Sequence, residues 1–423
     1  MQVFWNKVRL LFGDSSLRKR ILFVLFALIL FRLLAAVPVP AISSAELAGF
    51  LANNQFLGLL NIFSGGGLSN LSIVMLGVGP YITATIIMQL LTMVFPRLKE
   101  IYHEEGEAGR RRFSQYSRAL AIPLALVQGL GLLALLGSQG ILPTLGMFDR
   151  ITSIIVITAG SMLLMWLGEL VNEFGIGNGV SMIIFAGIVA GLPSAIGRIL
   201  FTFNLSQLPL YLGFIALAAV VIAGVVIVTE AERPIPVTYA KRVRGMKMYG
   251  GVSTYLPLRL NQAGVIPIIF ALSILLFPQM ITNLLAGSNN IILIGINKFV
   301  TAILSNTWIY ATLYFLLVFI FTYFYTAITF DPHATSENLQ KSGAFIPGTR
   351  PGASTAQHLS QIVTRLTTFG ALFLGIIAVL PIVLQGLTGL QTLAIGGTSL
   401  LIVVSVVIDL VKQLNAQLSI REY

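Results

Sequence analysis

The residue types that usually carry out chemistry are scarce in this sequence, and their spacing matches none of the common reactions. There is no cysteine, which excludes disulfides and thiolate metal sites. Three histidines, His103, His333 and His358, lie in polar segments between apolar runs, where an isolated imidazole is more often solvated than metal-bound. The sequence contains no P-loop, dinucleotide fingerprint, nucleophile elbow or zinc spacing. We therefore expect no catalytic residue, no metal site and no cofactor, and we do not expect an enzyme.

One glycine-rich run, Gly175–Gly179, is superficially similar to a phosphate-binding loop. It follows an apolar helical run rather than a strand, and it lacks the spacing of such a loop. The run instead predicts a tight turn between two helices.

Composition indicates what surrounds the chain. Of the 423 residues, 56% are hydrophobic and only 10% are charged, and the mean hydropathy is +0.91. Soluble domains carry about 25% charged residues. A chain so poor in charge cannot cover a water-facing surface, so we expect most of its surface to face lipid.

Hydropathy predicts ten membrane-spanning helices, each close to the roughly 20 residues that a bilayer requires. Lysines and arginines concentrate in alternate loops, which carry most of the net charge of +11, so both termini are predicted to be cytoplasmic. The predicted spans are 21–40, 75–96, 119–137, 151–171, 180–200, 208–229, 262–285, 308–330, 366–386 and 390–411.

The fold class is therefore an all-α polytopic membrane protein. Counting spans divides the chain near residues 1–202 and 203–423, with five spans in each half. Since five is odd, the second half must insert upside down relative to the first. Inverted halves related by an axis in the membrane plane are a known transport architecture.

The segment between spans one and two is apolar but rich in glycine, and it is too short to span. From Pro80 to Phe95 the second span is about 24 Å long at 1.5 Å per residue, shorter than the roughly 30 Å apolar core. We expect this span to begin inside the membrane below a re-entrant helix, which is tolerated only where protein or a water-filled cavity surrounds it. The alternative is an ordinary hairpin on the outer bilayer surface.

No span carries a carboxylate, lysine or histidine near its centre, because the carboxylates sit at the predicted cytoplasmic ends. Ion-coupled carriers usually bury such groups as proton or ion sites. Their absence favours a passive pore. The carboxylates concerned are Glu169, Glu173, Glu230 and Asp409.

Two long cytoplasmic loops, 230–260 and 331–362, carry basic clusters. Prolines and glycines flank Arg350, which predicts that a stiff turn presents it. Attraction to anionic lipid would explain the charge. Docking on RNA phosphates or on an acidic protein face is the alternative, and the residues alone leave both open.

Several stretches, in order along nearly the whole chain, resemble the SecY family, whose members are the central subunit of the bacterial protein translocase. They are Phe63–Gly66, Gly79–Ile82 with Ile86–Leu91, Glu105–Glu107 with Gly109–Arg111, Gly175–Gly179 with Ile184–Pro193, Gly264–Pro267, Lys341–Arg350 and Gly396–Ile402.

The resemblance implies an hourglass channel that passes unfolded, signal-bearing polypeptides and releases membrane helices sideways into lipid. Its waist would be a ring of aliphatic side chains, which exclude water and ions by dewetting. Two of the ring positions hold valine where isoleucine is common in the family, which predicts a slightly wider ring here. By position the ring comprises Val78, Ile82, Val180, Ile184, Ile269 and Ile402.

A plug is implied at 57–74, where Gly65, Gly66, Gly67, Leu68 and Leu71 would close the outer funnel at rest. The side exit would lie between spans two and seven.

At that exit Gln89 and Asn261 would face each other. A hydrogen bond between them across the closed gate is one hypothesis, and bonding of each within its own helix is the other.

The resemblance also gives the basic loops a use, the docking of the ribosome or of the SecA motor, to which ATP hydrolysis belongs. Other implied partners are the small membrane subunits SecE and SecG, signal peptides with nascent chains, and anionic lipids. The implied location is the bacterial plasma (inner) membrane, with the thylakoid membrane as the alternative. The docking residues would be Lys241, Arg242, Arg244, Lys247 and Arg350.

Two rival functions remain open from the sequence. The first is a secondary transporter of a small solute, because such transporters are also built from inverted halves. This function would give solute-specific flux. A lipid-handling or insertase scaffold without a pore predicts no conductance.

Overall fold

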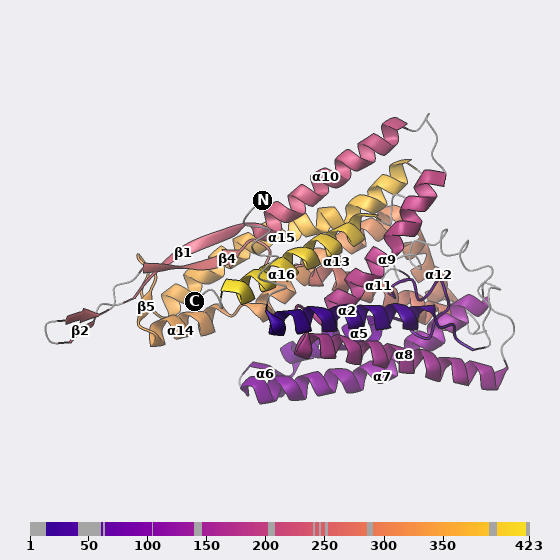
Figure 1. The fold of residues 1–423 in the computed structure, drawn as a ribbon, viewed down its shortest axis with the longest axis horizontal. Coiled ribbons are helices and arrows are strands. Elements are labelled where there is room, and N and C mark those ends of the chain that lie inside the picture. Colours follow the sequence, from indigo (N-terminus) through magenta and orange to yellow (C-terminus); the bar gives the residue numbers. More distant parts are fainter. Residues whose placement is uncertain are drawn as a thin grey trace.

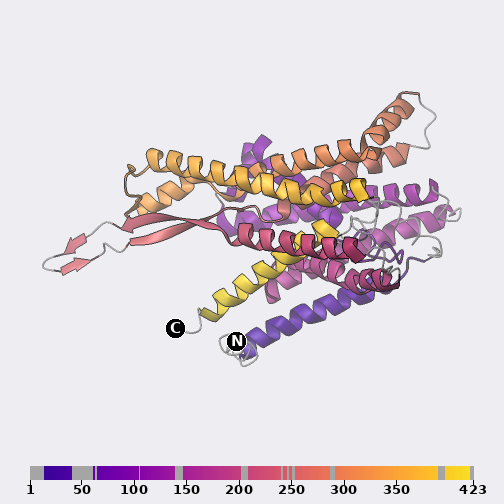
Figure 2. The same ribbon diagram turned by 90° about the horizontal axis from the view of Figure 1, so that it is seen from above.

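The computed structural model describes residues 14–40, 61, 64–103, 105–138, 146–201, 208–239, 242–244, 247–249, 253–285, 291–388 and 396–419. Long helices run roughly side by side along one axis of the molecule, and a small set of strands projects from one end (Figure 1). The beginning of the first described helix and the end of the last lie toward that same end, as a second view also shows (Figure 2).

Each of the ten predicted spans coincides with a helix. Six helices are long and apolar enough to cross a membrane within the described residues, and a seventh span is counted if a bent helix pair is one span. The ten helices are α2 (Ser15–Ala36), α5 (Gly79–Val94), α7 (Gly106–Ser138), α8 (Met147–Phe174), α9 (Gly179–Phe201), α10 (Leu208–Glu230), α11 (Ile266–Leu285), α13 (Thr307–Thr329), α15 (Ala353–Thr388) and α16 (Gly396–Ser419).

The second predicted span is short, as its sequence indicates. Helix α5 begins at Gly79 with Pro80 in its first turn, where the missing amide hydrogen of proline has no helical partner to lose. After Val94 the chain bends by 116° into α6 (Pro96–His103). Helix α5 therefore has only 16 residues, and the chain before it must enter the membrane region in another form.

Further elements connect the spans. Helix α12 (Ile291–Ser305) precedes α13, and helix α14 (Pro332–Lys341) follows it; α12 lies in a segment predicted to be an outer loop. Strands β1 (Glu232–Tyr239), β4 (Ser253–Arg259) and β5 (Ala344–Phe345) form one sheet in the order β4-β1-β5. Strands β2 (Arg242–Arg244) and β3 (Lys247–Tyr249) form a separate antiparallel pair beyond it.

The helices form two groups along the chain, those of residues 15–201 and those of residues 208–419. In Figure 1, α2, α5, α7 and α8 of the first group lie on the lower side of the view, and α10, α15 and α16 of the second lie on the upper side. The two groups meet where α11 packs against α5 and α7, and where α16 packs against α9. One hydrophobic cluster runs through both contacts, with members from α5, α9, α11 and α16. The two groups thus share an apolar contact.

The predicted tight turn joins α8 to α9. Gly177 has φ +90°, and the amide of Gly179 donates to the side-chain oxygen of Asn172 at 2.7 Å. A Cβ on Gly179 would lie 1.9 Å from the carbonyl oxygen of Gly168, so the close approach of α9 to α8 requires glycine.

Replacing Gly179 by alanine should destabilise the protein by about 1–3 kcal/mol, the usual cost of overpacking. The measurement is thermal unfolding in mild detergent. The matched control is Gly191→Ala in the same helix, because a Cβ at Gly191 meets nothing within 4 Å. Equal unfolding temperatures for the two variants would contradict the assigned packing.

Candidate channel site

The six residues predicted as a ring come together in the structure. Five are buried within one hydrophobic cluster, and Val180, which is partly exposed, packs against the same cluster. They come from four helices that belong to both groups, namely Val78 and Ile82 at the start of α5, Val180 and Ile184 in α9, Ile269 in α11 and Ile402 in α16.

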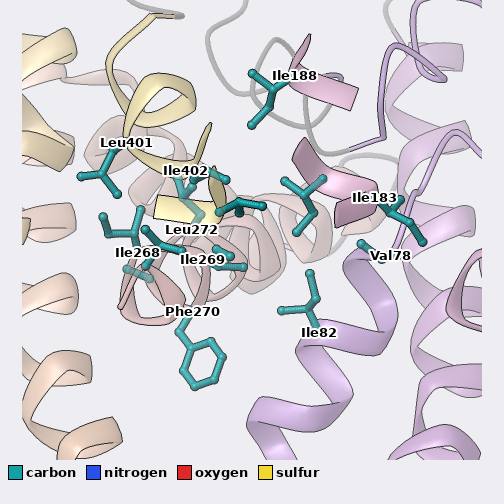
Figure 3. Close-up of a cluster of buried hydrophobic side chains, with 14 of the residues drawn as sticks. Val78, Ile82, Ile183, Ile188, Ile268, Ile269, Phe270, Leu272, Leu401 and Ile402 are labelled. Atoms are coloured by element: carbon teal, nitrogen blue, oxygen red, sulfur yellow. The ribbon is translucent and has the colours of Figure 1, made fainter. Parts of the chain in front are cut away.

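Figure 3 shows how these side chains lie. Ile82 and Ile269 project from α5 and α11 into the space between the two helices, with Ile402 of α16 nearby. Each has a small exposed fraction, 9% for Ile82, 7% for Ile269 and 2% for Ile402. Neighbouring members of the cluster, Ile183 and Leu401 among them, are also aliphatic. Because aliphatic side chains have no hydrogen-bonding groups, water gains nothing by entering between them.

The segment before α5, residues 64–78, is a succession of turns. We call residues 64–78 the turn segment. Asn61 is helical, while 57–60 and 62–63 of the predicted re-entrant helix lie outside the described residues. Gly65 and Gly66 have φ +67° and +82°, which few side chains tolerate. A Cβ on Gly65 would stand 2.2 Å from the ring of Phe31, so glycine lets the segment approach α2.

The turn segment is buried, and this excludes the alternative of a hairpin lying on the outer bilayer surface. Leu68 and Leu71 have no exposed surface and pack with Leu136 of α7 and Ile157 of α8 in a second cluster. A Cβ on Gly160 of α8 would lie 2.0 Å from the Ile73 carbonyl oxygen. The segment therefore sits among α2, α7 and α8.

Hydrogen bonds attach the turn segment to its surroundings. The amide of Val39 donates to the Leu71 carbonyl at 2.8 Å, and the amide of Ile73 donates to the Val37 carbonyl at 3.0 Å. The hydroxyl of Ser161 in α8 donates to the Gly77 carbonyl at 2.9 Å. These contacts satisfy backbone groups that a broken span leaves without helical partners.

The two predicted gate residues do not hydrogen-bond to each other. The side-chain amide of Asn261 donates to the Gly264 carbonyl at 3.1 Å, within its own segment. Its Oδ1 and the Oε1 of Gln89 are buried without a hydrogen-bond partner in the described part of the chain. Asn261 therefore bonds locally, as the second hypothesis predicted. The hypothesis of a hydrogen bond from Asn261 to Gln89 across the gate is wrong. The helices that carry or follow these residues, α5 and α11, do pack together.

The two long loops are brought together by strand pairing that the sequence analysis did not predict. Strand β1 of the first loop pairs with β5 of the second, with Thr238 opposite Phe345 and Tyr239 opposite Ala344. Ile235, Val237 and Leu359 are buried in a small core beneath this sheet.

Arg350 is exposed on a turn next to the sheet. Its carbonyl accepts a hydrogen bond from the Thr355 hydroxyl at 2.8 Å. Gly348 and Gly352 have φ +87° and +98°, which shape the turn. The predicted stiff turn is therefore present. Arg242, Arg244 and Lys247 lie on β2 and β3, whereas Lys241 falls outside the described residues.

Two of the carboxylates at helix ends have cationic partners. Glu169 of α8 pairs with Arg118 of α7 at 2.6 Å, and Glu230 of α10 pairs with Lys412 of α16 at 3.0 Å. Within the described residues, no group of three or more histidine, aspartate or glutamate side chains is arranged to hold a metal ion.

Sequence reasoning gave no role to Arg32 of α2. Its Nη1 donates to the Gly65 carbonyl at 2.6 Å. The signal was available, since an ionisable residue inside a span is a functional hypothesis by default.

Apolar helices in two groups, a broken span held in the protein interior and an aliphatic cluster contributed by both groups define an α-helical membrane channel. The SecY family model matches residues 72–411. The chain is 43% identical to protein translocase subunit SecY of Mycobacterium bovis, with 96% of each chain covered, and 42% identical to that of Streptomyces galbus, with 97% of each covered. The chain therefore belongs to the SecY family.

Solved structures have the same fold. One described as "The structure of a protein conducting channel" matches with a TM-score of 0.65 at 19% identity, covering 95% of this chain and 93% of that one. Sec61 in a canine ribosome-channel complex from the endoplasmic reticulum matches with a TM-score of 0.60 at 18% identity, with the same coverage. The family makes this chain a subunit of a protein translocase, so the small-solute transporter is set aside.

Proposed function

We propose that this chain conducts unfolded, signal-bearing polypeptides through the aliphatic cluster formed by α5, α9, α11 and α16. The observation that carries the proposal is the convergence of six branched aliphatic residues from both helix groups on one place. Such side chains form no hydrogen bonds with the passing chain, so they fit around any sequence and hold back water and ions when the pore is closed.

The turn segment would be the plug of this channel. Its buried position among α2, α7 and α8 supports this role, and so does its end at Val78, a residue of the ring. The side exit would lie between α5 and α11, whose contact is mainly apolar. Gln89 and Asn261 would mark that exit as polar groups left partly unsatisfied, which lowers the free energy needed to separate the helices.

The sheet and the β2–β3 pair would form the docking surface for a cytoplasmic partner, the SecA motor or the ribosome. The exposed Arg350 turn and the basic residues of the pair support this. SecE and SecG would pack on the lipid-facing helices, and anionic lipids would contact the basic loops.

We also propose a plasma-membrane location with both termini cytoplasmic. The start of α2 and the end of α16 lie toward the end of the molecule that carries the basic strands, which supports this orientation (Figure 1). The halves 1–202 and 203–423 would be related by inversion. The two separate helix groups are compatible with that relation.

Single cysteines at the six ring positions should crosslink to a translocating precursor stalled in vesicles that contain SecE, SecA and ATP. The chain has no cysteine of its own, so each introduced thiol reports on one place. The matched controls are cysteines at Ile227 and Phe369, apolar residues that are each 67% exposed and would face lipid. Crosslinks at the controls and none at the ring would sink the proposed path.

Deleting residues 65–72 should raise the ion conductance of the resting channel, because the deletion removes the buried leucines of the turn segment. Planar-bilayer recording measures this. The control is Ser69→Ala, which keeps the backbone amide that donates to Asn61. A conductance equal to that of the unaltered channel would reject the plug assignment.

Arg350→Glu should lower motor-driven transport by at least roughly tenfold, since a charge-assisted contact is worth about 1.5–3 kcal/mol. Folding should be unchanged, because the side chain is exposed and the turn is held by its backbone. The control is Arg97→Glu on α6, an exposed arginine remote from the sheet in sequence. Transport at the normal rate would remove Arg350 from the docking surface.

A further inference from the structure

Arg32 lies four residues before the end of α2, in a predicted span, and none of the ion pairs in the described part of the chain includes it. A charged side chain in a membrane helix is costly and needs a partner. Its partner here is a carbonyl of the turn segment, since Nη1 donates to Gly65 at 2.6 Å. A Cβ on Gly66 would lie 3.8 Å from the same nitrogen.

The Gly65 carbonyl is available because the turn segment makes its internal hydrogen bonds without it. The amide of Gly66 donates to Asn61, that of Gly67 donates to Ser64 and that of Ser72 donates to Gly67. The side-chain oxygen of Asn61 accepts from the amide of Ser69 at 2.8 Å. The segment thus holds its own shape through internal bonds, and the Gly65 carbonyl is left to accept from Arg32.

The turn segment is attached to α2 and to residues 37–39 by two kinds of hydrogen bond, backbone bonds and side-chain bonds. Two backbone bonds join residues 37–39 to residues 71–73, the base of the segment, while residues 64–70 form its tip. Nearer the tip there are two side-chain bonds, from Asn70 to the Ala35 carbonyl at 3.3 Å and from Arg32 to Gly65. The second is shorter and charge-assisted, so it is the stronger of the two. Moving the tip out of place therefore requires breaking the Arg32 bond.

We propose that Arg32 is the latch of the resting channel, a positioning residue that holds the plug closed through the Gly65 carbonyl. This inference rests on the proposed plug. The bond exists in the closed arrangement and is lost when the tip moves, so it shifts the equilibrium toward closure. A competing explanation makes Arg32 only a membrane anchor that stabilises α2.

The test compares Arg32→Met with Arg32→Lys in full-length channels reconstituted with SecE. Methionine keeps much of the length without a donor, and lysine keeps one cationic donor. The methionine variant should raise resting ion conductance about tenfold, the factor that corresponds to 1.4 kcal/mol. The lysine variant should fall between it and the unaltered channel. The control is Arg150→Met, an exposed arginine in the first turn of α8, which should change nothing.

The same substitution is then made in the channel that lacks residues 65–72. A latch has nothing to hold there, so Arg32→Met should add no further conductance. An added increase of the same factor would mean that Arg32 acts elsewhere, and the latch would be rejected. Normal conductance of Arg32→Met in a channel that leaks when the plug is deleted would reject it as well.

A second readout separates the latch from the plug. Spin labels on Ser69→Cys and Met147→Cys, the latter at the exposed first residue of α8, report the distance from the turn segment to a fixed helix. Arg32→Met should add a second distance population. If deletion causes no leak but this population appears, the sealing role fails and the latch stands. A distribution that the substitution leaves unchanged overturns the latch whatever the conductance shows.

Discussion

The structure depends on the need to satisfy backbone hydrogen bonds away from water. In a bilayer each unpaired amide or carbonyl costs several kcal/mol, so a span can break only where protein supplies partners. The turn segment meets this need with its own bonds and with Val37, Val39 and Ser161 around it. Gly65 follows from the same need, since only a residue without a Cβ lets the backbone approach Phe31 closely enough.

The aliphatic cluster differs from the hydrogen-bonded turn segment in that its contacts are apolar and have no fixed geometry. Groups bonded to each other in fixed geometry resist sliding, whereas aliphatic side chains can exchange neighbours at little cost. The two helix groups meet through such side chains at α5 and α11, and the polar groups near that contact, Gln89 and Asn261, do not bond across it. The contact that we propose opens is thus held mainly by burial, and an apolar signal helix would offer equivalent burial.

Hydropathy located a helix at each of the ten predicted spans, because each is rich in apolar residues, and the glycines and Pro80 indicated the broken span. The ring residues followed from resemblance alone, since any one of them is indistinguishable from other aliphatic residues in a span. Strand β5 has two residues, and its pairing with β1 spans about a hundred positions, so no local pattern reveals it. The charge of Arg32 inside a span was a signal, but its partner Gly65 could not be predicted, because a backbone carbonyl leaves no mark in the sequence.

The sheet is joined to the proposed gate by a short connection, residues 260–265. Strand β4 ends at Arg259, and α11 begins at Ile266 with Asn261 between them. The amide of Leu260 donates to the Ala231 carbonyl at 2.9 Å, which ties the end of α10 to the approach to α11, and Glu232 and Arg259 pair beside it at 3.5 Å. The register of β1 against β4 continues this tie along seven residue pairs. A partner that moves the sheet is therefore expected to move the start of α11 as well, because only residues 260–265 separate β4 from α11 and the Leu260 bond holds them to the end of α10.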